Sequence, residues 1–406
     1  MTDFSYEPAA SPASLRSNQR RALRALAWTD GLTRSELAAR LGLPKATLAG
    51  VLDSLVRLGL VSEAPSPTLG GRRAGRPPRL VSLSGHGPAV GAIVYSGGML
   101  STGLVSYSGS VLARMASWPS VHNLDDELFS LGAEALASAC AQPAAVGRAL
   151  TGVVVGVPTP VTSRRPSASE GADAGAGPGL TGSRGGHVRL VAHEVVTGLE
   201  GRLGVPVLVE NDANLGALGE ATFGAGVGVD TFLYLKLARG VGAGVVVGRR
   251  LHRGATGYAG ELGHVHVNDD GPVCGCGGRG CLHGILGDAL VRSVQPAYDR
   301  TLSFRDVLDL AAGGEPAPQR ALEDLGRAVG RPLADFVTLL NPEAIIVDGS
   351  FAAAAAHVVK GLRESLDRFA APLAAKALRV LPGALGDDAD LLGAAALARA
   401  ELDQRP

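Results

Sequence analysis

Three of the chain's four cysteines fall within eight positions of one glycine-rich stretch, GPVCGCGGRGCLHG, which spans residues 271–284. Cys274 and Cys276 are too close in sequence for an unstrained disulfide, and the two-residue gap of a thioredoxin-type redox pair is absent. Thiolates on a glycine-rich loop suit tetrahedral zinc, which needs a fourth ligand, and His264 lies ten residues before Cys274 in GELGHVHV. The spacing therefore predicts a structural zinc site; free thiols on a glycine loop are the alternative.

Cysteine usage and apolar content limit the class of protein. Four cysteines in 406 residues are far fewer than a secreted disulfide scaffold carries, and no apolar signal segment opens the sequence. Although 46% of the residues are hydrophobic, no unbroken run of about twenty apolar residues occurs. We therefore expect a cytoplasmic protein of two or three domains with no membrane partner.

The first 85 residues carry an excess of positive charge. They hold twelve Lys or Arg against six Asp or Glu, a net charge of +6 in a chain whose net charge is zero. Between residues 17 and 64, three stretches have helical spacing of apolar residues, separated at Asp30-Gly31 and at Gly42-Leu43-Pro44. Thr33 and Glu36 form a capping box that opens the second stretch. This pattern predicts a helix-turn-helix within a DNA-binding domain of residues 1–85.

The third predicted helix begins with Lys45, Ala46 and Thr47, whose side chains could reach base edges in a major groove. A loop rich in Gly, Pro and Arg then joins two strand-like runs in LVSEAPSPTLGGRRAGRPPRLVSL, the pattern of a wing. Four arginines of this segment can neutralise phosphates: Arg72, Arg73, Arg76 and Arg79. The GRP turn would place Arg76 in a narrow minor groove. We expect this domain to bind double-stranded DNA; a solvated basic linker is the alternative.

In residues 86–406 strand-like apolar runs alternate with helical stretches, as in VGAIVY, TGVVVGV, VPVLVE, TFLYLKL and AIIVDG. This alternation predicts an α/β body. MLSTGLVSYSGSVLARM has the pattern of a strand, a turn and a strand, so we expect a mixed sheet. Residues 162–186 lack periodicity and large apolar side chains, which predicts an extended, mobile surface loop.

Three stretches of this body carry groups suited to a ligand. VENDANLGALGE places Asn211 and Asp212 between a buried strand and a helix, where open α/β sheets bind ligands. Asp212 could accept a proton from a substrate hydroxyl or cap the helix. LARGVGAGVVVG offers backbone amides to a phosphate, or allows tight packing of a strand. GATGYAGELGHVHV holds Glu261 and His264 three residues apart, so both could face one pocket.

Together, VENDAN, LARGVGAGVVVGRRLHRGATGYAGELGH and CGCGGRGCL resemble the ROK family of repressors, open reading frames and sugar kinases. The resemblance runs from Gly91 through LNPEAIIVDGS to LLGAAALA, and the winged helix matches the repressor branch. It implies two actin-like lobes of ribonuclease H type around a sugar-binding cleft, in a homodimer or homotetramer. We expect the first lobe at about residues 88–206 plus the C-terminal helix, and the second lobe at about residues 207–390.

The resemblance also implies roles for single residues. It implies a zinc site formed by His264, Cys274, Cys276 and Cys281, which would hold the segment that carries the sugar-binding groups. It implies that sugar hydroxyls are bound by Asn211, Asp212, Glu261 and His264, with Asp212 as the general base if the chain is a kinase. His283 stands where the family has a Glu that contacts the sugar, so a group that can donate replaces one that only accepts. This change favours an unusual, phosphorylated or acidic sugar, or no sugar.

Departures from the kinase pattern argue against phosphoryl transfer. A ROK kinase opens its body with Asp-x-Gly-x-Thr, and this chain has Ile93 and Tyr95 in place of the Asp and the first Gly. Arg239 precedes Gly240 where the kinases carry Gly-Thr-Gly, and Thr159 replaces a Gly in GVPTPV. Because each change removes or crowds a phosphate contact, we expect no kinase activity.

These patterns predict a transcriptional regulator, in particular a repressor, controlled by a sugar or sugar phosphate. Its effector must bind the DNA-competent and DNA-incompetent arrangements with different affinities. One alternative is an ATP-dependent sugar kinase with an accessory DNA-binding domain. The other is a DNA-binding dimer whose body is an assembly scaffold without a ligand.

Overall fold

The computed structural model describes residues 17–26, 31–65, 79–84, 89–106, 109–119, 126–142, 145, 148, 150–161, 193–237, 240–286, 288–348, 351 and 354–402. Three arginines of the wing, Arg72, Arg73 and Arg76, lie outside the described residues. The expected loop over residues 162–186 and Arg239 also lie outside them.

The N-terminal elements form the predicted winged helix. They are α1 (Ser17–Leu26), β1 (Leu32–Thr33), α2 (Arg34–Leu41), α3 (Lys45–Arg57), β2 (Val61–Pro65) and β3 (Arg79–Leu83). The strands make an antiparallel sheet in the order β1-β3-β2, so β2 and β3 form the arms of the wing.

Local sequence explains how α2 and α3 are placed. The Thr33 hydroxyl accepts a hydrogen bond from the Glu36 amide, and the Glu36 carboxylate accepts one from the Thr33 amide, which confirms the capping box. Gly42 then ends α2 in the left-handed conformation at φ 63°. Leu48, Leu52 and Leu55 of α3 are buried against α1 and α2, which leaves the start of α3 exposed.

The described residues of the body form two five-stranded sheets. The first has the order β6-β5-β4-β7-β8, with β4 (Ala89–Ser96), β5 (Met99–Ser106), β6 (Val111–Ser117), β7 (Leu150–Val157) and β8 (Val207–Asn211). The second has the order β11-β10-β9-β12-β13, with β9 (Phe232–Leu237), β10 (Val241–Val247), β11 (Arg250–Leu251), β12 (Ala344–Val347) and β13 (Arg379–Pro382). Each sheet is mixed, as predicted, because its hairpin strands are antiparallel and its crossover strands are parallel.

The sheet order corrects one expected boundary. We expected the first lobe to end near residue 206, but β8 pairs with β7 in parallel and completes the first sheet. The boundary therefore falls one strand too early in the sequence interpretation. VPVLVE is one more apolar parallel strand, and nothing in its composition distinguishes an edge strand of one sheet from a strand of the next.

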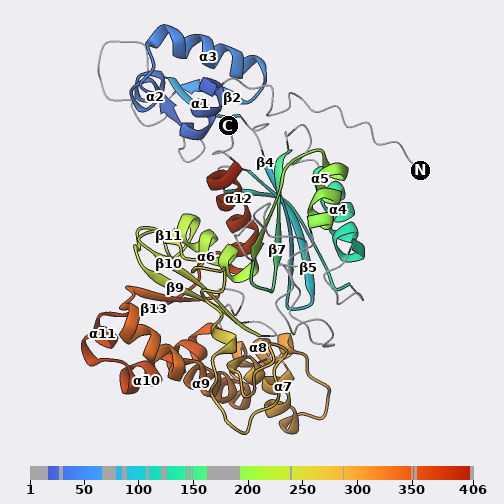
Figure 1. Cartoon of the computed structure of the whole chain (residues 1–406), viewed down its shortest axis with the longest axis vertical. Helices are drawn as coiled ribbons and strands as arrows, with labels where there is room; N and C mark the ends of the chain where they lie inside the picture. Colours follow the sequence, from blue (N-terminus) through green and yellow to red (C-terminus); the bar gives the residue numbers. More distant parts are fainter. Residues whose placement is uncertain are drawn as a thin grey trace, which may run out of the picture.

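Helices cover both faces of each sheet (Figure 1). The first sheet packs α4 (Asp126–Cys140) and α5 (His193–Leu203) on one face and α12 (Ala389–Leu402) on the other. Against the second sheet lie α6 (Asp212–Phe223) on one face, and on the other α7 (Asp288–Val294), α8 (Phe304–Ala312), α9 (Pro316–Leu340) and α10 (Ala355–Phe369). Short helix α11 (Pro372–Ala377) follows α10. Among the described helices, none is long and apolar enough to cross a bilayer.

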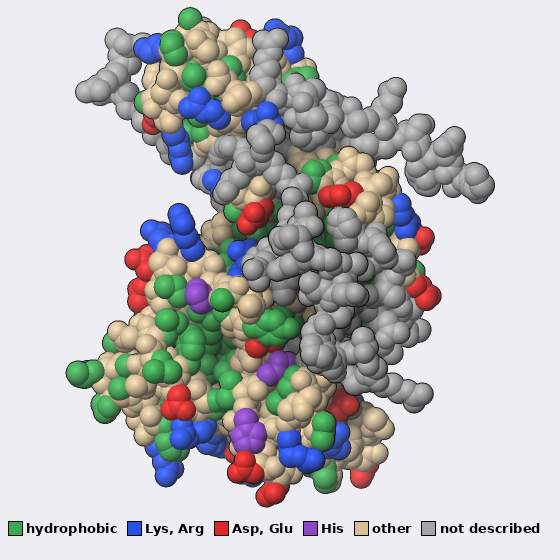
Figure 2. Space-filling model, in the orientation of Figure 1, with side chains coloured by type: hydrophobic (Ala, Val, Ile, Leu, Met, Phe, Trp, Pro, Cys, Tyr) green, Lys and Arg blue, Asp and Glu red, His purple; other side chains and the backbone are tan. Residues whose placement is uncertain are grey.

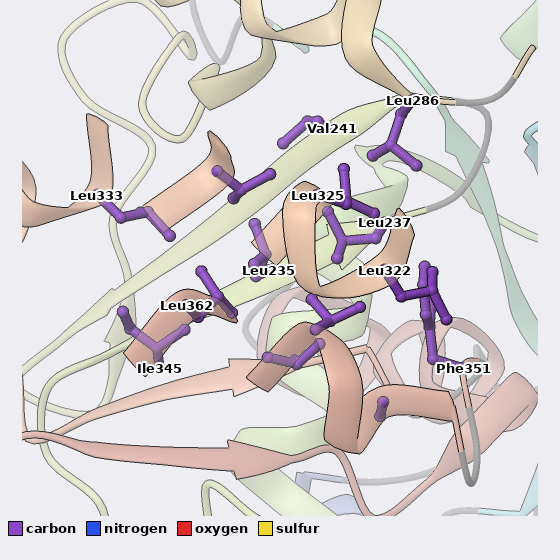
Figure 3. Close-up of a cluster of buried hydrophobic side chains, with 14 of the residues drawn as sticks. Leu235, Leu237, Val241, Leu286, Leu322, Leu325, Leu333, Ile345, Phe351 and Leu362 are labelled. Carbon is purple, nitrogen blue, oxygen red and sulfur yellow. The ribbon is translucent and has the colours of Figure 1, made fainter. Parts of the chain in front are cut away.

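Among the described residues, the largest apolar cluster lies between the second sheet and its outer helices (Figure 3). Leu235 and Ile345 point from the sheet toward Leu325 and Leu333 of α9 and Leu362 of α10, and all five side chains are at most 4% exposed. This cluster fixes β9, and β9 together with β10 forms one wall of the pocket described below.

Candidate functional site

A pocket of about 410 Å³ opens where the β4–β5 turn, the start of α6, the strands β9 and β10, and the segment 261–283 meet. Its wall includes every residue that the sequence interpretation assigned to ligand binding: Asn211, Asp212, Glu261, His264 and His283. The pocket also takes in Tyr95, Ser96, Gly97 and Gly98 from the first sheet and Lys236 from the second. The two sheets therefore contribute to one site.

Asn211 and Asp212 have different tasks at the start of α6. The Asn211 side chain accepts a hydrogen bond from the Asn214 amide at 3.1 Å, so Asn211 is the N-cap. Asp212 is the first helical residue; its Oδ1 accepts from the Ala213 amide at 2.9 Å and its Oδ2 from the Ser96 hydroxyl at 2.5 Å. Of the two roles open to Asp212, the cap belongs to its neighbour, and Asp212 faces the pocket.

A buried ion cluster surrounds Asp212. The Lys236 ammonium lies 3.2 Å from Asp212 Oδ2 and also donates to Asp390, the second residue of α12. Burial alone would lower the pKa of Lys236, but the two carboxylates raise it above the usual value, so the ammonium is charged. Burial raises the pKa of Asp390 to about 6, against the opposing effect of Lys236. Lys236 of β9 therefore forms ion pairs with both α6 and α12.

Glu261 stands between two close contacts with β10. A Cβ at Gly260 would lie 2.1 Å from the Ala243 carbonyl oxygen, and one at Gly263 would lie 2.2 Å from that of Val241. These glycines press the segment with Glu261 against the strand, so its carboxylate faces the pocket. Burial, followed by the negative charge of Asp212, raises the pKa of Glu261 to about 7. Near neutral pH the carboxyl can accept or donate a hydrogen bond, which suits a sugar hydroxyl.

His264, Cys274, Cys276 and Cys281 form a compact cluster next to the pocket. One ligand atom from each lies within 4.8 Å of all the others. The Cys274 Sγ is 3.6 Å from His264 Nδ1, and the Cys276 Sγ is 3.6 Å from the Cys281 Sγ. In tetrahedral zinc with bonds of about 2.3 Å, neighbouring sulfurs lie roughly 3.8 Å apart, so the donor types and spacings fit Zn²⁺. The four residues could hold a metal; His264 Nε2 then remains toward Glu261, 3.7 Å away.

The glycines of GVGAG, residues 240–244 at the start of β10, make room for protein atoms. A Cβ at Gly240 would lie 2.1 Å from Cε1 of His283, and one at Gly244 would lie 2.5 Å from the Ala217 side chain of α6. The ring of His283 stacks on that of His264 with centroids 6.2 Å apart. The sequence allowed two hypotheses for these glycines, a phosphate site and close packing. Close packing accounts for Gly240 and Gly244.

The positions that depart from the kinase pattern fall in different places. Ile93 is fully buried among the side chains between the first sheet and α4, whereas Tyr95 lines the pocket. Thr159 is buried, and its carbonyl oxygen accepts a hydrogen bond from the Asn211 amide side chain at 3.3 Å. The carbonyl of Thr159 thus orients the side chain of Asn211, a predicted sugar-binding residue.

Several residues in and around the site were not identified from the sequence. Ser96 and Lys236 line the pocket and contact Asp212. Outside the pocket wall, Asp390 binds Lys236, and Glu210, 3% exposed, binds the Arg253 guanidinium at 2.7 Å. Lys236 had a recognisable signal, because it is the one charged residue in the apolar run TFLYLKL. A charge in a buried strand needs a partner, but the sequence does not show that Asp390, 154 positions away, supplies it.

The DNA-binding candidates that the structure describes lie on the winged helix. Lys45, Ala46 and Thr47 form the exposed start of α3, and Lys and Arg side chains occupy several places on the described surface of this domain (Figure 2). Arg79 is turned toward β2, where it donates to the Glu63 carbonyl oxygen at 2.9 Å. Arg34 also contacts Glu63, at 2.6 Å.

Relatives of known name include repressors and kinases. The chain is 33% identical to the xylose repressor of Bacillus spizizenii over 48% of its own length and 51% of that protein, so it spans about half the length of this relative. It is 24% identical to the xylose repressor of Caldicellulosiruptor bescii over 90% of its length and 91% of that protein. It is 36% identical to the glucokinase of Streptomyces coelicolor over 50% of its length and 69% of that protein.

Among the solved structures that resemble this chain are a regulator and a kinase. A ROK family transcriptional regulator described as a homologue of the E. coli MLC protein has a TM-score of 0.70, 23% identity, and coverage of 95% of this chain and 96% of that one. A ROK family glucokinase of Streptomyces griseus, in complex with glucose and AMPPNP, has a TM-score of 0.64, 28% identity, and coverage of 77% and 99%. These likenesses confirm the predicted winged helix followed by a two-lobed, actin-like body.

Two family models match successive parts of the chain. Residues 14–70 match the MarR family, which agrees with the winged helix. Residues 131–401 match the ROK family and include the pocket residues from Pro158 to His283 and the complete Cys/His cluster. Because this second match covers more than half of the chain, the protein belongs to the ROK family.

Proposed function

We propose that this protein is a sugar-responsive transcriptional repressor that binds operator DNA through its winged helix. The observation that carries the proposal is that one chain joins an exposed recognition-helix start to a pocket lined by carboxylate, amide and imidazole groups. Such groups bind sugar hydroxyls, and α3 has the position of a helix that enters a major groove. Relatives named xylose repressors support it.

We propose that the effector is a sugar or a sugar phosphate bound by the five polar pocket residues. Asn211 and Asp212 approach it from α6, and Glu261, His264 and His283 approach it from the opposite segment. Zn²⁺ at the Cys/His cluster would fix the ring of His264 and the loop between residues 264 and 281. The metal then has a structural role, because its four ligands leave no open coordination position.

We propose that the chain has no kinase activity. A general base must accept a proton from the substrate hydroxyl, whereas Oδ2 of Asp212 already accepts from Ser96 and lies against the Lys236 ammonium. The named glucokinase relatives keep phosphoryl transfer as the second candidate, with Asp212 as its base.

We also propose that the protein assembles as a homodimer or homotetramer in the cytoplasm. Such an assembly would present two winged helices to the two half-sites of an operator.

The test combines operator binding with thermal melting. DNA selected from a random pool by the zinc-loaded protein is titrated with D-xylose, D-glucose and their phosphates, and melting is followed with and without Mg-ATP. A sugar at about a hundred times its dissociation constant should add roughly 2.7 kcal/mol of stability and weaken DNA binding. Stabilisation by Mg-ATP with formation of a sugar phosphate would establish the kinase instead. If the protein binds DNA and no ligand has an effect, the remaining hypothesis is a DNA-binding dimer whose body is an assembly scaffold.

The wing arginine gives a specific prediction. Arg76→Ala should weaken operator binding and reduce the slope of log K against log salt by about 1, because one phosphate-neutralising charge is lost. Fluorescence anisotropy at four salt concentrations measures both quantities. Arg305→Ala, an exposed arginine of α8 in the body, is the control and should leave both unchanged. An unaltered slope in Arg76→Ala would remove the wing from the DNA interface.

A further inference from the structure

We propose that helix α12 transmits the occupancy of the pocket to the winged helix, and that the buried contact between Lys236 and Asp390 is its connection to the pocket. This inference rests on the sugar-responsive function proposed above and names the element that would make it work. It follows from contacts at the two ends of α12 and along its length.

The pocket end of α12 is electrostatic. Lys236 and Asp390 are 9% and 18% exposed, and the same ammonium lies 3.2 Å from Asp212 Oδ2. A ligand hydroxyl that hydrogen-bonds to Asp212 competes with Ser96 and Lys236 for this carboxylate. Because buried charges interact strongly with their few partners, a change at Asp212 alters the force on Asp390.

Along its length α12 is in backbone contact with α6, the helix that Asp212 begins. A Cβ at Gly393 would lie 1.8 Å from the Leu215 carbonyl oxygen, and a Cβ at Gly219 would lie 2.2 Å from that of Ala389. The helices touch where each has a glycine, so no side chain can absorb a relative shift. A displacement of α6 by a ligand at Asp212 must therefore move α12 or break this contact.

The segment just before α12 is held from both lobes. The buried Glu220 of α6 accepts hydrogen bonds from the amides of Ala384 and Leu385, at 3.2 and 3.0 Å. Arg114 of β6 lies 3.1 Å from Asp388. The start of α12 is thus anchored to α6 on one side and to the first sheet on the other.

The far end of α12 approaches the winged helix. With 14 residues, α12 extends about 21 Å from the ion cluster, and Figure 1 shows it pointing from the junction of the lobes toward the winged helix. Leu83, the last residue of β3, packs both against the winged-helix core and against the apolar cluster that α12 forms with the first sheet. One side chain of the wing therefore shares a cluster with the helix.

The first experiment removes the charge at the pocket end. Operator affinity is measured for wild type, Asp390→Asn and the control Asp387→Asn, with and without saturating D-xylose, and D-xylose binding is measured separately by calorimetry. Asp390 does not line the pocket, and Asp387 is an exposed carboxylate of the same segment. The wild-type ratio of affinities should be about 5- to 150-fold, as in other allosteric proteins, and should fall below about 2-fold only in Asp390→Asn.

The second experiment tests the other end. Leu83→Ala should also lower the ratio. Leu23→Ala removes a leucine that, among the described clusters, packs on the winged-helix core alone, and it should keep the ratio. Hydrogen exchange of the β3 amides, measured without any ligand, should accelerate in Asp390→Asn relative to Asp387→Asn.

The outcomes separate the two proposals. A wild-type protein that binds DNA but responds to no sugar contradicts the sugar-responsive function. In that case the hydrogen exchange of the β3 amides alone tests whether α12 connects the pocket to the winged helix. A folded Asp390→Asn variant with the wild-type ratio and wild-type β3 exchange overturns the transmission by α12 and leaves the function intact.

Discussion

Cys276→Ser is expected to reduce bound zinc from about one ion per chain to nearly none and to lower the melting temperature of the body by about 10 °C. A serine hydroxyl is a poor zinc ligand, so the remaining three donors cannot close a tetrahedral site. A metal present at about a thousand times its dissociation constant adds roughly 4 kcal/mol of stability, and this contribution is lost with the ligand. Metal analysis of the purified protein and calorimetric melting measure the two effects.

The consequence should reach the pocket, because His264 belongs to both the cluster and the pocket wall. Without the metal the imidazole is free to rotate, and ligand affinity should fall together with zinc content. Cys140→Ser is the matched control, because this cysteine lies in α4 outside the cluster and its replacement should leave zinc content unchanged. Full zinc occupancy in Cys276→Ser would show that the cluster does not hold the ion.

The local parts of this structure could be predicted from the sequence. Thr33 and Glu36 mark a helix start through hydrogen bonds that span three residues, so their spacing is sufficient to identify the cap. His264 and the three clustered cysteines lie within 18 positions, and the glycines between them allow the tight turns that bring them together, such as Gly277 at φ 88°. The capping box and the Cys/His cluster could be predicted because their residues lie close together in the sequence.

Long-range pairings could not be predicted in the same way. Lys236 and Asp390 meet only because β9 and α12 pack on the two sides of α6, and neither residue belongs to a pattern that names the other. The placement of β8 in the first sheet depends on its pairing with β7, whereas its composition fits either sheet. The glycines of β10 were ambiguous because a close backbone approach has the same sequence signature for a phosphate as for a helix.

Asp212→Asn is expected to weaken binding of the sugar effector by about 10- to 150-fold, since hydrogen bonds to a charged group contribute roughly 1.5–3 kcal/mol. The amide keeps the size of the carboxylate but has one acceptor oxygen, and the Ser96 hydroxyl already uses an oxygen of this side chain. Calorimetric titration with the sugar that stabilises the wild type measures the loss. Asp309→Asn, an exposed carboxylate of α8, is the control and should bind normally.

The same variant distinguishes a binding carboxylate from a catalytic one. If Asp212 only binds the effector, neither wild type nor Asp212→Asn transfers phosphate from Mg-ATP, and the variant holds its operator at sugar concentrations that release the wild type. If Asp212 is a general base, the wild type forms a sugar phosphate and the variant loses turnover by several orders of magnitude while sugar binding changes little. The Lys236 ammonium, 3.2 Å from Asp212 Oδ2, favours the first result, because a proton transferred to this oxygen would have to displace the ammonium contact.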